Sequence, residues 1–560
     1  MPAAALLLPV ALLAGGAVLS SLAGRAGARA GRGLAACFAW AALVAMIVIW
    51  LRPFGILPER TPLDLTIGEL GAGVRLAVRL DAVSFAFGLF LLLPVSVLLT
   101  VLRSPSPPLA LFAAATSLLS LEASGLILAT FAWGATFLAV GLLLQAGGES
   151  KPTAMRLRDQ FSIFLLLWAA AAIHARAGTD QYAAIPVSAL TPAIFGLVAL
   201  SALLAAGLVP WKSWPSVLWE RFRPETAGLA ISVTFFTGFY FLVRMYQTGG
   251  GHYPRPLFNL VLAALGVACL LAATLRAQAA PTRRAYLGET LPIAGGFALL
   301  ALGLGTPLGV AAAIGTLAVT SLVTALLPMV PEEALSGPMM LVLVLSVGLP
   351  PTAVFGIRLL DIQAALESNE VTGYLGLVAA AAWVIGIAAA ARAVRLANAS
   401  RVPSRVPSRV SRWGVVMVGG ALAVGGAAMG VLQSAIAIPV ASAVVGFPRT
   451  SLTGGLVAVA AASGSWRAVA LGGLVVLGLL GLAIAGRRVA VPSPAGDPPQ
   501  AYIEPRWRSL PDRLGGIADR FEIPAEFRVT GWQRIDGAMT GGTVWLWIAV
   551  MVILGLVVTR

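Results

Sequence analysis

Ionisable side chains are rare in the apolar parts of this sequence, and those that occur there could take part in ion movement. A charge at the centre of a lipid bilayer costs about 2.5–3.5 kcal/mol on insertion scales, so each needs a partner or a function. Arg358 and Asp361 lie one helical turn apart, where an ion pair can form. The other candidates for ion translocation lie near the ends of apolar stretches: Asp81, Glu122, Lys212 and Glu225.

The composition explains why these few residues stand out. The chain has 560 residues, of which 59% are hydrophobic and 11% charged, with a mean hydropathy of +0.92. A soluble domain carries roughly 25% charged residues, so a water-soluble globular protein is excluded. The apolar stretches run to about twenty residues, the length of a membrane-crossing helix, rather than the roughly ten of an outer-membrane strand. The sequence therefore predicts an all-α polytopic membrane protein.

We expect about 14–16 transmembrane helices in this chain. The sixteen apolar spans are approximately 3–23, 33–51, 82–102, 108–121, 125–146, 160–176, 192–210, 226–246, 257–276, 286–304, 307–330, 338–360, 373–395, 413–435, 467–486 and 542–558. Before the third span, residues 52–81 alternate in part between apolar and polar, which predicts a short external hairpin.

Two spans contain residues that break helices. The seventh span ends with Gly207 and Pro210, and the twelfth contains Gly348, Pro350 and Pro351. Proline lacks a backbone donor and interrupts a helix, although single kinks are common in membrane helices. Matched breaks in two halves are typical of inverted-repeat transporters, with the ion path near the breaks. We therefore expect two inverted five-helix repeats.

These features divide the chain into six regions. They are N-terminal helices with the hairpin (1–107), a first repeat (108–246), a second repeat (257–397), C-terminal helices (398–488), a polar connector (489–541) and a terminal transmembrane helix (542–560).

The charge distribution predicts an orientation. The net charge of +15 comes from basic residues scattered one to three per loop, which argues against nucleic-acid binding. When alternate loops are assigned to opposite sides, most arginines fall on one side, which the positive-inside rule makes cytoplasmic. Both termini would then face outward from a bacterial inner membrane.

Three tryptophans are expected to be interface anchors beside a charged cluster that includes Lys212. They are Trp211, Trp214 and Trp219.

No redox cofactor is expected in this chain. Its only cysteines, Cys37 and Cys269, fall in separate apolar spans, which argues against a disulfide, an Fe–S cluster or a cysteine zinc site. The only histidines are His174, at a span end, and His252, in a loop, so haem ligation by a helix pair is improbable.

Several short motifs follow one another through residues 70–400. They are Leu80-Asp-Ala-Val-Ser-Phe85, Pro210-Trp-Lys-Ser-Trp-Pro215, Pro224-Glu-Thr-Ala-Gly-Leu229, Gly238-Phe-Tyr-Phe-Leu-Val-Arg244, Arg283-Arg-Ala-Tyr286, Gly303-Leu-Gly-Thr-Pro307, Ala311-Ala-Ala313 and Gly348-Leu-Pro-Pro-Thr352. In order and spacing they resemble the antiporter-like subunits of respiratory complex I, Mrp-type sodium/proton antiporters and energy-converting [NiFe] hydrogenases. Sixteen spans with a polar connector before the last most resemble the largest, distal subunit of complex I.

The departures from that family bear on mechanism. Where the family has titratable residues in its fifth, seventh, eighth and eleventh helices, this chain has Gly134, Ala205, Ala230, Thr320 and Thr324. Only the cation of the twelfth helix is kept, as Arg358. An arginine is effectively always protonated, so it carries protons poorly and acts as a fixed charge.

The sequence leads to one main hypothesis and three alternatives. The resemblance implies a membrane-arm subunit of a proton- or sodium-translocating complex, partly structural and with its own pumping weakened or absent. Its partners would be other membrane-arm subunits and a peripheral redox module. The alternatives are that Glu122, Lys212 and Glu225 rebuild a proton path, that the chain is a cation/proton antiporter, or that it serves an inorganic-carbon uptake module.

Overall fold

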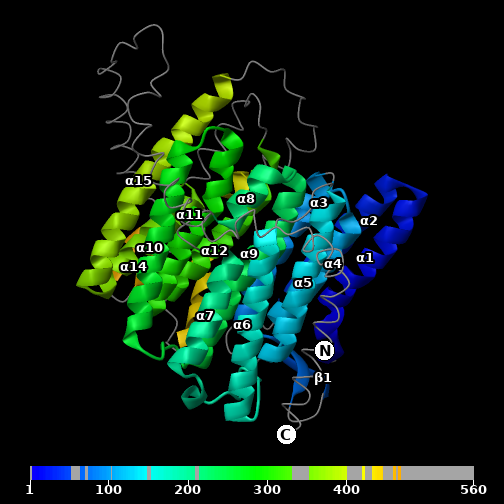
Figure 1. The fold of residues 1–560 in the computed structure, drawn as a ribbon, viewed down its shortest axis with the longest axis horizontal. Helices are drawn as coiled ribbons and strands as arrows, with labels where there is room; N and C mark the ends of the chain where they lie inside the picture. Colours follow the sequence, from blue (N-terminus) through cyan, green and yellow to red (C-terminus); the bar gives the residue numbers. More distant parts are fainter. Residues whose placement is uncertain are drawn as a thin grey trace, which may run out of the picture.

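The helices of this protein form one bundle (Figure 1). The computed structural model describes residues 3–51, 63–69, 74–102, 104–147, 153–208, 213–330, 348, 352–399, 419–422, 432–445, 458–461 and 464–467. Within these residues, ten helices are long and apolar enough to cross a membrane. Shorter apolar helices cover 107–122, 192–206 and 435–445. The fold is thus the all-α membrane architecture that the composition predicts. The predicted spans 467–486 and 542–558 and the connector 489–541 lie outside the described residues, except for Arg467.

The N-terminal region contains three helices and a hairpin. Its elements are a 3-10 turn (Ala3–Leu7), α1 (Leu8–Ala26), α2 (Ala28–Leu51), β1 (Leu63–Glu69), β2 (Arg75–Leu80) and α3 (Ala82–Val101). The strands pair antiparallel, with Asp64 opposite Arg79, which confirms the predicted hairpin. Asp81 then caps α3 by accepting hydrogen bonds from the backbone of Val83 and Ser84.

The two halves that follow have a similar order of elements. The first contains α4 (Pro107–Glu122), α5 (Leu126–Ala146), α6 (Thr153–Ala177), α7 (Pro192–Ala206), α8 (Trp214–Arg221) and α9 (Pro224–Thr248). The second contains α10 (Pro256–Ala279), α11 (Arg283–Gly303), α12 (Pro307–Leu326), α14 (Ala353–Ser368) and α15 (Glu370–Ala399).

The glycines of both predicted helix interruptions have positive φ. Helix α7 ends at Gly207, whose φ of 71° is left-handed. Gly348 has a φ of 98°, and α14 begins at Ala353, where Thr352 caps it; the rest of the second predicted break lies outside the described residues. Glycine adopts positive φ without the penalty that a Cβ imposes, which explains why it occurs at both places. Pro210, Pro350 and Pro351 lie outside the described residues.

The loops gather at two ends of the bundle. The end that contains Asp180 is here called the Asp180 end. There the side-chain amide of Gln181 donates to the carbonyl of Arg75, and the hydroxyl of Tyr246 donates to the carbonyl of Gly305. At the other, here called the Thr226 end, a Cβ on Gly147 would lie 3.2 Å from the hydroxyl of Thr226. Successive helices therefore run between the same two ends.

Three features differ from the sequence prediction. Helix α14 continues to Ser368, beyond the expected end at 360, with Arg358 and Asp361 paired inside the bundle. Beyond the predicted span 413–435, most of which lies outside the described residues, α18 runs over Ile438–Val445. A hairpin of β3 (Ala458–Ala461) and β4 (Gly464–Arg467) was not predicted.

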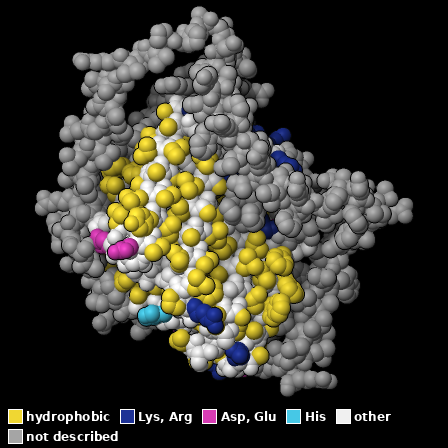
Figure 2. All heavy atoms as spheres, turned by 60° about the vertical axis from the view of Figure 1, so that its left-hand side comes forward, with side chains coloured by type: hydrophobic (Ala, Val, Ile, Leu, Met, Phe, Trp, Pro, Cys, Tyr) yellow, Lys and Arg dark blue, Asp and Glu magenta, His cyan; other side chains and the backbone are white. Residues whose placement is uncertain are grey.

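One face of the bundle is apolar over a wide area. Figure 2 shows a broad band of hydrophobic side chains with charged groups mainly near its margin. Its large exposed side chains on α10, α14 and α15 are Leu257, Leu260, Val261, Leu366, Val371, Tyr374, Leu377, Val378 and Val384. A patch of this kind is unfavourable in water and suits contact with lipid or another membrane subunit.

Candidate functional site

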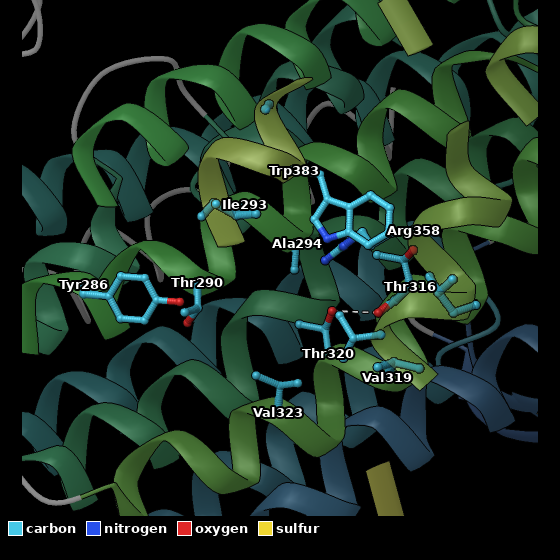
Figure 3. Close-up of a pocket in the computed structure, with 14 residues that line it drawn as sticks. Tyr286, Thr290, Ile293, Ala294, Thr316, Val319, Thr320, Val323, Arg358 and Trp383 are labelled. Atoms are coloured by element: carbon cyan, nitrogen blue, oxygen red, sulfur yellow. Dashed lines mark hydrogen bonds between the residues drawn. The ribbon is translucent and has the colours of Figure 1, made fainter. Parts of the chain in front are cut away.

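A small cavity lies between α11, α12, α14 and α15 in the second half. It measures about 40 Å³, enough for a few water molecules at roughly 10–15 Å³ each. Its polar lining groups are Tyr286, Thr290, Thr316, Thr320, Arg358 and Trp383. Figure 3 shows Tyr286 and Thr290 at one end and Arg358 with Trp383 toward the other. Arg358 thus brings a positive charge to a mostly apolar pocket.

The Arg358 guanidinium is held by two neighbours. It lies 3.4 Å from the Asp361 carboxylate on the next turn of α14, so the predicted ion pair is confirmed. Its central carbon lies 4.1 Å from the centre of the Phe297 ring, a cation–π contact. Thr316 of α12 donates a 2.8 Å hydrogen bond to Asp361 Oδ2, the same carboxylate oxygen that Arg358 contacts. The charge is therefore fixed between two helices rather than left free in the cavity.

A line of threonines runs along α12 beside this pair. The hydroxyl of Thr320 donates to the backbone oxygen of Thr316 at 2.6 Å (Figure 3). The hydroxyl of Thr324 donates to the backbone oxygen of Thr320 at 2.8 Å. Both hydroxyls thus donate within their own helix and keep lone pairs that can accept from water. At these two positions the resemblance implies a histidine and a lysine, which can hold a proton, whereas a threonine cannot.

A second buried ion pair joins α3 to α9. Arg244 donates to both carboxylate oxygens of Asp81, at 2.6 and 2.8 Å. It also donates to the Tyr240 hydroxyl and to Gln247, whose amide reaches the carbonyl of Ala443. Burial alone would raise the pKa of Asp81, but the Arg244 charge and its hydrogen bonds hold that pKa below its usual 3.8. This two-point geometry is typical of a structural clamp.

Glu122 is the last residue of α4 and is buried. The structure gives its Oε2 atom no hydrogen-bond partner within the described part of the chain. The next residues turn toward the hairpin, since Ser124 donates its backbone N–H to Ala77. Glu122 therefore lies at the Asp180 end, in the half of the molecule that does not contain the Arg358 cavity.

The predicted site residues do not converge on one place. Asp81 and Glu122 lie at the Asp180 end, Glu225 lies in the first turn of α9 at the Thr226 end, and Arg358 and Asp361 lie between. Lys212 is outside the described residues. The structure thus brings together only Arg358 with Asp361, to which it adds Thr316.

Besides the Asp81–Arg244 pair, a second buried ion pair was missed by the sequence reasoning. Glu289 of α11 is buried and accepts a 3.0 Å hydrogen bond from Arg276 of α10. Glu289 lies inside the predicted span 286–304, so the same search for charges in apolar spans could have found it. Arg276 had been placed in a loop, which hid the pairing.

The interpretation of two tryptophans as interface anchors is wrong. Trp214 and Trp219 of α8 are buried inside the bundle, at 6% and 1% exposure. The Trp214 ring N–H donates to the carbonyl of Ala205, and the Arg158 guanidinium lies over its ring. Helix α8 turns these rings inward against α11 and the end of α7, so they pack as core residues. Trp211 lies outside the described residues.

Within the part of the chain that the structure describes, no group of three or more His, Cys, Asp and Glu side chains could hold a metal ion. Cys37 and Cys269 are both free thiols there, the first exposed and the second buried.

Comparison with solved structures identifies the fold. The chain superposes on the Mrp complex from Dietzia sp. DQ12-45-1b with a TM-score of 0.69 and 20% identity, covering 99% of this chain and 63% of that one. For the membrane-bound sulfane sulfur reductase, an archaeal respiratory membrane complex, the TM-score is 0.71 at 17% identity, covering 99% and 100%. For respiratory complex I from Thermus thermophilus with bound NADH it is 0.65 at 20% identity, covering 79% and 98%.

No family model and no curated protein matches the sequence. The chain has the fold of the antiporter-like membrane subunits in these complexes, as its motifs suggested. It spans about two thirds of the Mrp chain and the whole of the sulfane sulfur reductase chain.

Proposed function

We propose that this chain is a membrane-arm subunit of a proton- or sodium-translocating complex, in which it acts mainly as a scaffold with little pumping of its own. The observation that carries the proposal is the Arg358–Asp361–Thr316 arrangement at the interrupted helix of the second half. A pump needs a group at this depth that gains and loses a proton. Arginine stays protonated, and here its charge is already matched by a carboxylate.

The first half supports the same proposal. The resemblance implies a glutamate, a lysine and a histidine where this chain has Gly134, Ala205 and Ala230. All three residues are buried among apolar side chains. Glycine and alanine hold no proton, so a relay of titratable groups is interrupted there. The wide apolar face on α10, α14 and α15 supports a role in contact with lipid and neighbouring membrane subunits.

We also propose that the Thr226 end faces the cytoplasm of a bacterial cell. The arginines at that end are Arg25, Arg29, Arg32, Arg156, Arg158, Arg221, Arg223, Arg276, Arg283 and Arg284. At the Asp180 end, arginines are accompanied by acidic residues such as Asp64, Glu69 and Asp81. The positive-inside rule then puts the N-terminus outside, since the first helical turn packs against β1. A protease-sensitive N-terminal tag cut from the cytoplasmic side would contradict this orientation.

The experiment that tests the scaffold proposal measures transport. The complex containing this chain is purified in mild detergent, reconstituted into vesicles and assayed for proton and sodium uptake. Arg358→Ala, Glu122→Gln and Lys212→Ala are compared with the wild type and with Arg75→Ala, a control at an exposed arginine. We expect each of the three variants to keep at least half of the wild-type transport rate. If each abolishes transport, relocated charges form a working path and the scaffold proposal is wrong.

The proteins that copurify distinguish the kinds of complex. Subunits with Fe–S clusters or flavin support a role beside a peripheral redox module. A chain that transports cations alone supports a stand-alone antiporter. A soluble partner without redox centres supports a role in energising uptake of inorganic carbon.

A further inference from the structure

The C-terminal helical segment places a polar side chain in the middle of the bundle. Gln433–Ala437 form a π-helix that continues into α18 and packs against α12. Gln433 is 1% exposed, and its amide nitrogen and oxygen both lack hydrogen-bond partners within the described residues. An amide in apolar surroundings keeps its polar atoms bonded, because leaving them unpaired is unfavourable. Something other than a described protein group must therefore meet this amide.

Asp361 has a matching unpaired atom. Its Oδ2 accepts from Thr316 and Arg358, whereas its Oδ1 has no partner in the described part of the chain. The residue is completely buried, so bulk water does not reach that oxygen. A carboxylate oxygen accepts hydrogen bonds strongly. The ion pair thus leaves one strong acceptor unused.

Gly315 brings these unpaired groups to the same turn of α12. A Cβ on Gly315 would lie 2.5 Å from Ile357 Cδ1 of α14 and 2.9 Å from the Gln433 side-chain nitrogen. Asp361 lies one turn beyond Ile357 and bonds to Thr316, the neighbour of Gly315. Both the α14 side chains and the Gln433 amide therefore approach α12 at residues 315–316, where the absence of a side chain makes room for them.

We infer that Gln433 and Asp361 share one or two buried water molecules, which link the C-terminal segment to the ion pair on α14. Water fits the chemistry, because it can accept from the amide N–H while donating to the carboxylate oxygen. A cation fits poorly, since Arg358 already neutralises Asp361. Gln433 is thus a positioning residue: through water it holds Asp361 in the orientation that pairs with Arg358. This inference does not depend on whether the chain pumps.

The test is a double-mutant cycle in the intact, detergent-purified complex. Tm is measured for Gln433→Leu, Asp361→Leu and the double variant, with Gln145→Leu as a control at an exposed glutamine. If water joins the two residues, the double variant loses clearly less Tm than the sum of the single losses. Additive losses, or no loss in Gln433→Leu, would overturn the inference.

Infrared difference spectra in H2¹⁸O give a second measurement that needs only Gln433→Leu to fold. The expected result is an isotope-sensitive O–H band of buried water in the wild type and in Gln145→Leu that is lost in Gln433→Leu. An identical band in all three proteins would refute the assignment. If NaCl but not choline chloride raises the Tm, and only in proteins that retain Gln433, the bound species is a sodium ion and the water assignment is wrong.

Discussion

Replacing Arg244 by methionine should strongly destabilise the protein, because it leaves the buried Asp81 with only Arg79, at 3.4 Å, as a charged partner. The guanidinium contacts both oxygens of Asp81, at 2.6 and 2.8 Å, and the two side chains are 3% and 11% exposed. At a charge separation of about 4 Å and an effective dielectric of about 20, the attraction is about 4 kcal/mol. Breaking one side of such a pair costs about 3–5 kcal/mol.

The assay is unfolding of the detergent-purified protein, followed by tryptophan fluorescence, for Arg244→Met, for Arg244→Met with Asp81→Asn, and for a control. The double variant should regain much of the loss, because asparagine is neutral and can still cap α3. Arg75→Met is the control, since the Arg75–Glu69 pair is more than 60% exposed at both side chains and such pairs contribute about 0–1 kcal/mol. If Arg244→Met costs no more than Arg75→Met, the clamp interpretation fails.

The same pair predicts an acid dependence. The pKa of Asp81 lies below its usual 3.8 in the folded protein, so its contribution is complete above about pH 4 and is lost as the pH falls through the lowered value. The gap in stability between wild type and Arg244→Met should therefore narrow only below that pH. A constant gap from neutral to strongly acidic pH would contradict this reasoning.

Three further predictions concern other parts of the fold. Gly207→Ala should cost about 1–2 kcal/mol from its positive φ alone, whereas Gly15→Ala, in open space within α1, should be neutral or stabilising in the same unfolding assay. Thr316→Val should cost about 1.5–3 kcal/mol, more than Thr320→Val, because only the first removes a hydrogen bond to a carboxylate. Burial raises the pKa of Asp180, offset in part by a backbone N–H, so its stabilising contribution falls as the pH rises through that raised value. The Asp180→Asn variant should therefore lose less stability than the wild type as the pH rises from acidic to neutral. A pH profile of stability that the substitution leaves unchanged would refute this prediction.

Features that local rules decide could be predicted from the sequence. Two side chains three residues apart on one helix lie close together whatever surrounds the helix, so Arg358 and Asp361 could be predicted as partners. Glycine followed within three residues by proline in an apolar span predicts an interruption, and Gly207 and Gly348 both have positive φ. The cap of α3 by Asp81 follows from residue type and spacing in the same way.

The partners that lie far apart in the chain could not be predicted. Asp81 and Arg244 are 163 residues apart, and nothing in either local pattern singles out the other. Trp214 and Trp219 were misplaced because an aromatic residue beside charges suits a membrane interface equally well, and only the packing of α8 turns them inward.

The sequence by itself determined that this is a helical membrane protein and where most of its described helices lie, because hydrophobic length and backbone preference act over a few residues. The tertiary structure decided which polar groups meet: Thr316 with Asp361, Arg276 with Glu289, and Gln433 with the turn at Gly315. In an apolar bundle an unpaired polar group is costly, so helices settle where their polar side chains find partners, and that depends on how all of them pack.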